Sequence, residues 1–155
     1  HNRLFINIFN IYKIKSFYLY YWIVKTISKL KKELDKWFSL FIRLRHASKD
    51  GIVQCYTCDK TGHYKKGMHA GHFMSRRHLA TRWHEDNVQV QCYRCNMHLS
   101  GNVYAYSKLL DIRIEEGTAE KLNLLATRST IKFMRCDYEE LIEKYKEKVN
   151  AIKAD

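Results

Sequence analysis

Two short cysteine motifs, Cys55-Tyr56-Thr57-Cys58 and Cys92-Tyr93-Arg94-Cys95, enclose a histidine-rich stretch that contains His69-Ala70-Gly71-His72. Each motif offers two thiolates, and four thiolates complete the tetrahedral shell of a structural zinc ion without any histidine. We therefore expect one structural Zn2+ on the four cysteines of the two motifs. The histidines between the motifs remain for other chemistry.

The two motifs lie farther apart than in an ordinary zinc ribbon. Their usual separation is about 15–20 residues, whereas residues 59–91 separate them here. Residues 52–54 and 88–91 have strand character, so each motif follows a short strand. The centre of the chain is therefore expected to fold as strand, strand and short helix, clasped at both ends by the cysteine pairs.

Helical patterns flank this centre on both sides. Between Lys29 and Arg45, apolar residues recur at helical spacing, with lysines and arginines on the other side. Helices are also expected from about Val103 to Glu115, from Thr118 to about Arg128, and after Asp137, which forms a capping-box pattern with Glu140.

These patterns predict an α+β fold with four parts. They are an aromatic, basic N-terminal extension of unknown role (residues 1–28), an amphipathic helix (29–50), a zinc-bound core (51–104) and a helical C-terminal scaffold (105–155). In the extension, the apolar run from Ser16 to Val24 is shorter than the roughly 20 residues that a membrane span requires. An interfacial helix, a packed element and a loose extension remain open for it, as does a truncated upstream context.

The charge of the chain favours a polyanionic partner. Lys and Arg total 28 against 16 Asp and Glu, giving a formal charge of +12. The excess lies within residues 1–104, because residues 105–155 are balanced. Nucleic acid is the leading candidate and an anionic membrane surface the second. Paired motifs without a secretory signal indicate metal binding in a reducing compartment, and Cys136, outside the pairs, is expected to be a buried or incidental thiol.

Several segments of the chain resemble the phage NinG/Rap recombination-protein family. These segments are Lys66-Gly67-Met68-His69-Ala70-Gly71-His72-Phe73, Ala80–Val88, Gln91–Asn96 and Ser100-Gly101-Asn102, and the resemblance extends upstream through Phe38–Arg45 and downstream to Asp137–Leu141. The resemblance implies a zinc-stapled ββα-metal (HNH-like) finger flanked by N- and C-terminal helices. It also implies a metal-dependent endonuclease that cuts branched DNA in recombination, encoded by a phage or prophage and acting in the bacterial cytoplasm.

The resemblance assigns His72 as the general base. A neutral imidazole with a pKa of about 6.5 can accept a proton from water at physiological pH. Asn87 corresponds to the middle residue of the HNH pattern and is expected to hold the loop that carries His72. The alternatives are a histidine in a polar core position and an asparagine that caps a turn.

The catalytic metal ligands are less clearly marked. Gly71 occupies the usual ligand position, and His69 lies three residues before His72, so both histidines reach one site only if the strand is bulged at Gly71. Asn96 is the second expected ligand, and His98 competes with it. Mg2+ or Mn2+ is the expected catalytic ion, and the imidazole of His69 favours Mn, Ni or Zn over Mg.

DNA contacts are expected from four basic residues within or beside the inserted unit, Arg76, Arg77, Arg82 and Lys108. Tyr56, Tyr93 and Trp83 either stack on unpaired bases or pack in the core. A homodimer would suit a symmetric DNA junction.

Two other functions remain as alternatives. A catalytically inactive, zinc-containing DNA-binding protein is favoured by Gly71 in the ligand position. A thiol-disulfide oxidoreductase would use the same cysteine motifs, but the sequence lacks the βαβ pattern of that class.

Overall fold

The computed structural model describes residues 25–154, so most of the N-terminal extension lies outside the described residues. In chain order the elements are α2 (Ile27–Leu44), β1 (Ile52–Gln54), β2 (Thr61–His63), β3 (Met68–His72), α3 (Leu79–Arg82), β4 (Val88–Cys92), η1 (Arg94–His98), α4 (Val103–Arg113), α5 (Thr118–Arg128) and α6 (Arg135–Ala154). The mixed α+β character is confirmed. No helix among residues 25–154 is both long and apolar enough to cross a membrane.

Helix α2 is the amphipathic helix expected before the cysteine motifs. Its first turn is capped by Thr26, whose hydroxyl accepts a hydrogen bond from the backbone N–H of Lys29 at 3.3 Å. One face is buried, and its buried residues are Leu30, Leu34, Phe38, Phe41, Ile42 and Leu44. The 3.6-residue period of these apolar side chains explains why the sequence alone indicates this helix.

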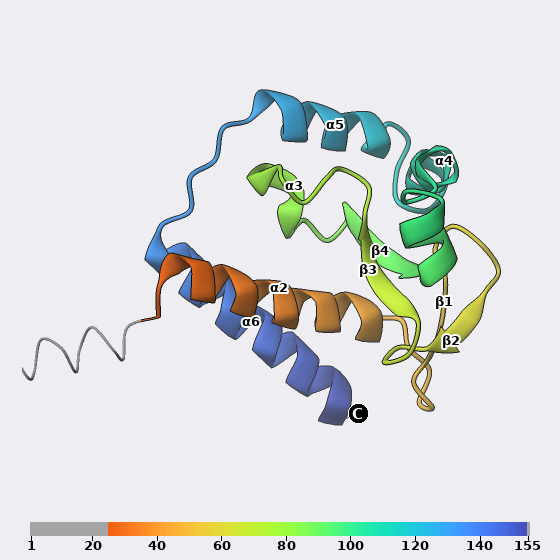
Figure 1. The fold of residues 1–155 in the computed structure, drawn as a ribbon, viewed down its shortest axis with the longest axis horizontal. Helices are drawn as coiled ribbons and strands as arrows, with labels where there is room; N and C mark the ends of the chain where they lie inside the picture. Colours follow the sequence, from red (N-terminus) through yellow and green to blue (C-terminus); the bar gives the residue numbers. More distant parts are fainter. Residues whose placement is uncertain (1–24, 155) are drawn as a thin grey trace, which may run out of the picture.

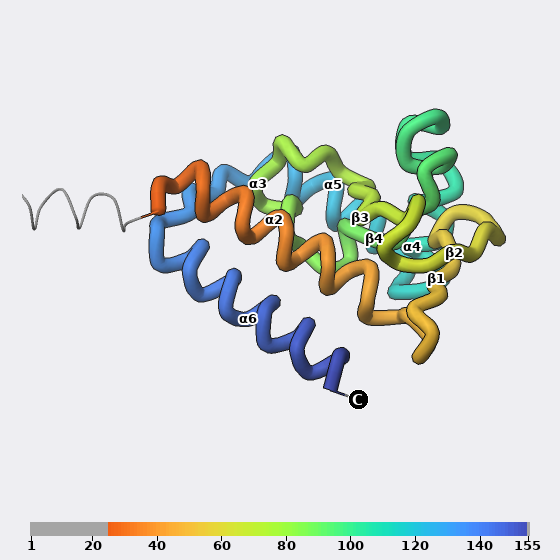
Figure 2. Tube along the Cα trace, turned by 60° about the horizontal axis from the view of Figure 1, so that its bottom comes forward, coloured from red at the N-terminus to blue at the C-terminus, as the bar shows by residue number. Residues whose placement is uncertain are grey.

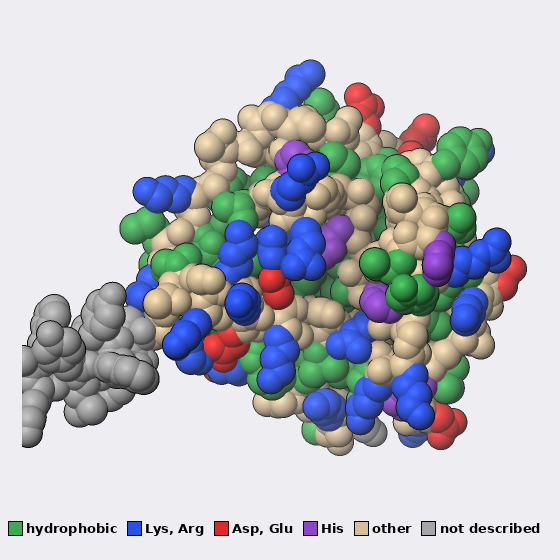
Figure 3. All heavy atoms as spheres, in the orientation of Figure 1, with side chains coloured by type: hydrophobic (Ala, Val, Ile, Leu, Met, Phe, Trp, Pro, Cys, Tyr) green, Lys and Arg blue, Asp and Glu red, His purple; other side chains and the backbone are tan. Residues whose placement is uncertain are grey.

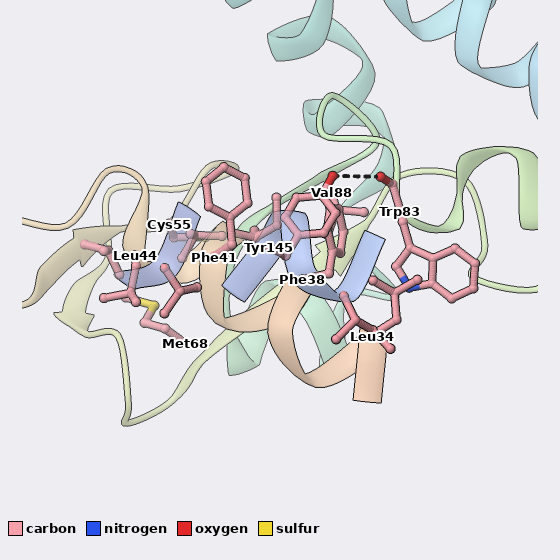
Figure 4. Packing of buried hydrophobic residues seen from close by; sticks show 14 of the residues in the cluster. Leu34, Phe38, Phe41, Leu44, Cys55, Met68, Trp83, Val88 and Tyr145 are labelled. Carbon is pink, nitrogen blue, oxygen red and sulfur yellow. Dashed lines mark hydrogen bonds between the residues drawn. The ribbon is translucent and has the colours of Figure 1, made fainter. Parts of the chain in front are cut away.

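Helices α2 and α6 lie side by side and run in the same direction, although they come from opposite ends of the described chain (Figures 1 and 2). Tyr145 of α6 is buried between them, with its ring centre 4.9 Å from that of Phe38 and 5.4 Å from that of Phe41. The Tyr145 hydroxyl donates to the backbone oxygen of Trp83 at 3.4 Å (Figure 4). The pair of helices thereby packs against the loop that precedes β4.

The strands form two antiparallel pairs, β1 with β2 and β3 with β4. Met68, Val88 and Val90 of the second pair join the large apolar cluster built on α2 and α6. A smaller cluster, centred on Tyr106, Leu110 and Leu122 of α4 and α5, gathers Phe73 and Met74 from the segment after β3. The β3–β4 pair is therefore held by both apolar clusters.

The start of α6 differs from the predicted capping box. The helix begins at Arg135, so Asp137 lies inside the first turn, where its carboxylate accepts a hydrogen bond from the backbone N–H of Met134 at 2.6 Å. Asp137 therefore caps α6 from a position in its first turn. Glu140, the other residue of the expected capping box, is exposed. Helix α5 has the predicted bounds, but Gly117 with φ of 80° precedes its first turn and Thr118 is already helical.

Leu34→Ala tests the packing of α2. Leu34 is fully buried, so we expect the substitution to lower the free energy of unfolding by about 2–5 kcal/mol through lost burial and a residual cavity. Leu124→Ala is the matched control, because Leu124 is a helical leucine that is 36% exposed; its effect should stay below about 0.5 kcal/mol. Urea unfolding followed by circular dichroism measures both, and equal effects would contradict this packing.

Candidate functional site

The four cysteines of the two motifs come together as predicted. Cys55 follows β1, Cys92 ends β4 and Cys95 lies in η1, and the Sγ atoms of these residues and of Cys58 all lie within 4.8 Å of one another. Four thiol groups at this separation are the donor set of a tetrahedral structural zinc site. Such a site joins two strands and the helical turn η1 at a single point.

The pKa values of these thiols differ without a cation between them. Burial raises the pKa of Cys58 to about 12. Burial also opposes ionisation of Cys55, but hydrogen bonds from the backbone of Cys92 and Thr57 outweigh it and lower the Cys55 pKa to about 7. A divalent cation is what allows four neighbouring thiols to ionise together, so the donor set fits a metal better than it fits free thiols.

His72 ends β3, and one of its ring nitrogens is already engaged. Its Nε2 lies 3.1 Å from the backbone oxygen of Arg82. Because a carbonyl oxygen only accepts, Nε2 donates, and the neutral ring keeps a lone pair on Nδ1. Burial is the main cause that lowers the His72 pKa. The hydrogen bond to the Arg82 backbone raises the pKa in part, and the charges of Arg76 and Arg82 lower it. The imidazole is therefore neutral near pH 7, with Nδ1 able to accept a proton.

Asn87 is fully buried and ties the chain after His72 to α3. Its Nδ2 donates to the backbone oxygens of Met74 and Thr81 at 3.0 and 2.9 Å, and its Oδ1 accepts from the Met74 N–H at 2.7 Å. The backbone oxygen of Asn87 also accepts from the N–H of Phe73 at 2.8 Å. The amide thus fixes the segment that follows the histidine, which is the contact expected of it.

Arg82 does not occupy the position predicted for a DNA contact. Its side chain is 10% exposed, its Nε and Nη2 donate to the two carboxylate oxygens of Asp35, and its Nη1 donates to the backbone oxygen of Arg76. Asp35 also accepts from the indole N–H of Trp83 at 3.0 Å. The guanidinium is therefore used inside the protein, and it fixes the residue whose carbonyl holds His72.

The bulge predicted at Gly71 is absent from the β3–β4 pair. Every residue of β3 has a partner in β4, including His69 with Gln91 and His72 with Val88. Glycine is needed at position 71 for a different reason: a Cβ atom there would overlap the Gln91 side chain. Gln91 needs this space because its amide nitrogen donates to Thr57 Oγ1 at 3.0 Å and to the backbone oxygen of Gly101 at 2.7 Å.

The structure does not bring His69 and His72 together. On a regular strand, residues three apart point to opposite faces. The ring of His69 instead lies 5.7 Å from that of Tyr93, which lies 5.2 Å from that of His98. The Asn96 side chain donates a hydrogen bond to the sulfur of Met97 at 3.7 Å. Within residues 25–154, the cysteine cluster is the only group of three or more His, Cys, Asp or Glu side chains placed to hold a metal.

The other predicted contact residues divide by burial. Arg76, Arg77 and Lys108 are exposed, and Tyr93 is 50% exposed. Trp83 is buried and Tyr56 packs against Tyr106, so both aromatic side chains belong to the core. Cys136 is exposed rather than buried.

Three residues that support the site carried no sequence signal for it. They are Asp35, which holds Arg82, Gln91, which joins the zinc region to Gly101, and Tyr106, whose hydroxyl donates to the backbone oxygen of Gly71 at 3.0 Å. Asp35 and Tyr106 lie on helices outside the β3–β4 pair, far from their partners in sequence. The sequence offered one hint, for Asp35 alone: it is an acidic residue on the strongly basic polar face of α2.

Cys92→Ser tests the metal centre. The substitution removes a buried ligand, so we expect loss of the single bound zinc ion per chain and loss of the cooperative unfolding transition, because structural zinc contributes directly to folding. Cys136→Ser, at the exposed cysteine, should keep both. Zinc content by elemental analysis and thermal unfolding are the measurements. A Cys92→Ser protein that still holds one zinc ion would contradict the assignment.

Comparison with known proteins supports one relationship. No curated protein and no solved structure matches the chain. Residues 20–155 match the protein family described as Bacteriophage Lambda NinG protein, and this span includes the cysteine cluster, His72 and all of the described helices. The chain therefore belongs to the NinG family.

Proposed function

We propose that this NinG-family protein is a metal-dependent endonuclease that hydrolyses phosphodiester bonds in branched DNA recombination intermediates. The observation that carries the proposal is the state of His72, a neutral imidazole with one nitrogen fixed by Arg82 O and the other able to accept a proton. The order β3, β4, η1 around this histidine supports a ββα-metal (HNH-like) finger, clasped by the cysteine cluster.

In the proposed reaction, Nδ1 of His72 takes a proton from water as that water attacks the phosphorus atom. The P–O bond to the 3′ oxygen breaks, and this oxygen takes up a proton from solvent, which leaves a 5′-phosphate and a 3′-hydroxyl end. The hydrogen bond from Nε2 to the backbone oxygen of Arg82 stabilises the imidazolium that forms, because a carbonyl oxygen accepts well from a charged donor. Asn87 keeps the base in place through the Met74 and Thr81 contacts. A closed shell of four thiolates has no open position, so the structural zinc takes no part in the chemistry.

The proposed ligands of a catalytic ion remain His69 and Asn96, with His98 as the alternative to Asn96. Because β3 is regular, His69 and His72 point to opposite faces, and this placement counts against an ion shared with the His72 site. One imidazole and one amide oxygen would hold the ion only in part. Mg2+ or Mn2+ at these residues would supply charge neutralisation at the phosphoryl oxygens. The imidazole makes Mn2+ the better fit.

The charge around the site supports a DNA substrate. Residues 60–110 hold eight Lys and Arg but only two acidic residues, Glu85 and Asp86. Glu85 is engaged by Lys148 and by the hydroxyl of Tyr145, so it adds little negative field. Lys and Arg side chains gather on the face shown in Figure 3. Arg76, Arg77 and Lys108 are the proposed phosphate contacts, and two copies of the chain would match a symmetric junction.

A catalytically inactive DNA-binding protein is the second candidate. It is favoured by Gly71 in the usual ligand position and by the separation of His69 from His72 on a regular strand. The two candidates share the DNA contacts and differ only in hydrolysis.

His72→Ala tests the chemistry. Removal of a general base should slow cleavage by about 10²–10⁴-fold without weakening DNA binding. The assay is nicking of a labelled three-way or four-way junction in Mn2+ or Mg2+, with His46→Ala as the exposed-histidine control. Unchanged cleavage by His72→Ala would overturn the assigned base. Junction binding without cleavage by the unmodified protein in either metal would establish the inactive candidate.

The pH dependence of single-turnover cleavage provides a second test. The base works only when unprotonated, so a lowered His72 pKa should place the acidic limb of the rate profile below pH 6.5, the ordinary histidine value. Arg76 is one cause of that lowering, so Arg76→Gln should move the limb to higher pH, whereas Arg77→Gln should leave it in place. If Arg76→Gln leaves the acidic limb unchanged, the group that titrates in the rate profile is not His72.

A further inference from the structure

An exposed apolar surface lies on both sides of Cys95, the last cysteine of the cluster. Between residues 93 and 104, five large apolar or aromatic side chains are 45–73% exposed, and we call them the apolar tip: Tyr93, Met97, Leu99, Val103 and Tyr104. Scattered exposed apolar residues are ordinary, but five within one short segment mark an interaction surface. In Figure 3, hydrophobic and histidine side chains gather beside Lys and Arg where the chain passes between β4 and α4.

The backbone that carries the apolar tip is held in an uncommon conformation. Three consecutive residues have positive φ, Ser100 at 48°, Gly101 at 87° and Asn102 at 48°. Left-handed backbone at a residue other than glycine is strained and is kept where surrounding contacts enforce it. Here the N–H of Gly101 donates to Cys95 O at 2.9 Å, and the Asn102 amide donates to Thr57 O. Both contacts tie the turn to the cysteine motifs, so the apolar side chains are presented from a fixed frame.

The apolar tip lies beside the proposed catalytic histidine. A Cβ atom on Gly101 would stand 3.9 Å from the backbone oxygen of His72. At the other end, the N–H of Tyr93 donates to Gly67 O at 3.0 Å, which joins the tip to the turn before β3 and its exposed Lys65 and Lys66. A partner on the tip would therefore lie next to the end of the strand that carries His72.

The charge around the apolar tip selects the kind of partner. Residues 87–110 contain no Asp or Glu, and both of their basic residues, Arg94 and Lys108, are exposed. The ammonium of Lys108 lies 4.4 Å from the ring centre of Tyr104. Aromatic faces set among cations are the surface on which nucleic-acid bases stack while the backbone is neutralised, and apolar side chains such as Met and Leu separate stacked base pairs.

We propose that the apolar tip engages unpaired or unstacked bases at the branch point of the DNA, with Tyr93 and Tyr104 as stacking faces and Met97 and Leu99 as a wedge. The inference rests on the proposed action on DNA and adds the element that distinguishes a branch from continuous duplex. Continuous duplex offers the phosphate contacts but no free base faces, so the tip contributes to binding only at a branch.

The experiment measures DNA affinity without added catalytic metal, so that it does not depend on cleavage. Fluorescence anisotropy gives Kd for a three-way junction and for a duplex of the same sequence, with the unmodified protein, Tyr104→Ala, the double variant Met97→Ser/Leu99→Ser, and Ile112→Ser as an exposed apolar control on α4. We expect each tip variant to lose about tenfold or more in junction affinity and less than about twofold in duplex affinity. The tip variants should also quench the fluorescence of a 2-aminopurine base at the branch less than the unmodified protein does.

Three outcomes would overturn the inference. Junction affinity unchanged in the tip variants would show that the tip does not touch the branch. Equal loss on junction and duplex would make it a general contact. If the tip variants lose a dimer that the unmodified protein forms in sedimentation velocity, while their DNA affinity per protomer is unchanged, the tip contacts a second copy of the chain instead of DNA. Failure of the unmodified protein to bind any DNA would instead remove the proposed function itself, and failure of His72→Ala to affect cutting would leave the binding result standing.

Discussion

The rest of the structure depends on the meeting of four thiols at one point. Cys55, Cys58, Cys92 and Cys95 join the end of β1, the end of β4 and the turn η1. Strands of three to five residues are not stable alone, so a metal held by the four thiols would add to the apolar contacts that keep these strands in place. The left-handed turn at 100–102 is tied to the same point through Cys95 and Thr57.

The environment of His72 is assembled largely by the helices outside the strand pair. Asp35 of α2 binds Arg82, the Arg82 carbonyl binds His72, and Tyr106 of α4 binds the carbonyl of Gly71 just before it. A buried ion pair contributes little net stability, but it fixes orientation, and a base within hydrogen-bond reach of its proton must be fixed in orientation. The flanking helices are therefore part of the site.

The sequence alone was enough for the features that rest on local pattern. The cysteine spacing predicted the cluster, and the 3.6-residue period predicted α2, because both signals lie within a few residues. The sequence did not indicate the close packing at Gly71 or the internal contacts of Arg82, because each depends on a partner distant in sequence, Gln91 and Asp35 respectively. The start of α6 differs for a local reason, because the Asp137 carboxylate accepts a hydrogen bond from the backbone N–H of Met134.

The central claim is that the fold holds His72 as a neutral imidazole protonated on Nε2. Two-dimensional NMR of protein labelled with 15N in its histidine rings reports tautomer and pKa directly, and His72→Gln identifies the signal. We expect the Nε2–H tautomer at pH 7 and a His72 pKa below 6.5. An Nδ1–H tautomer, or a pKa above 6.5, would contradict it and remove the basis for His72 as the general base.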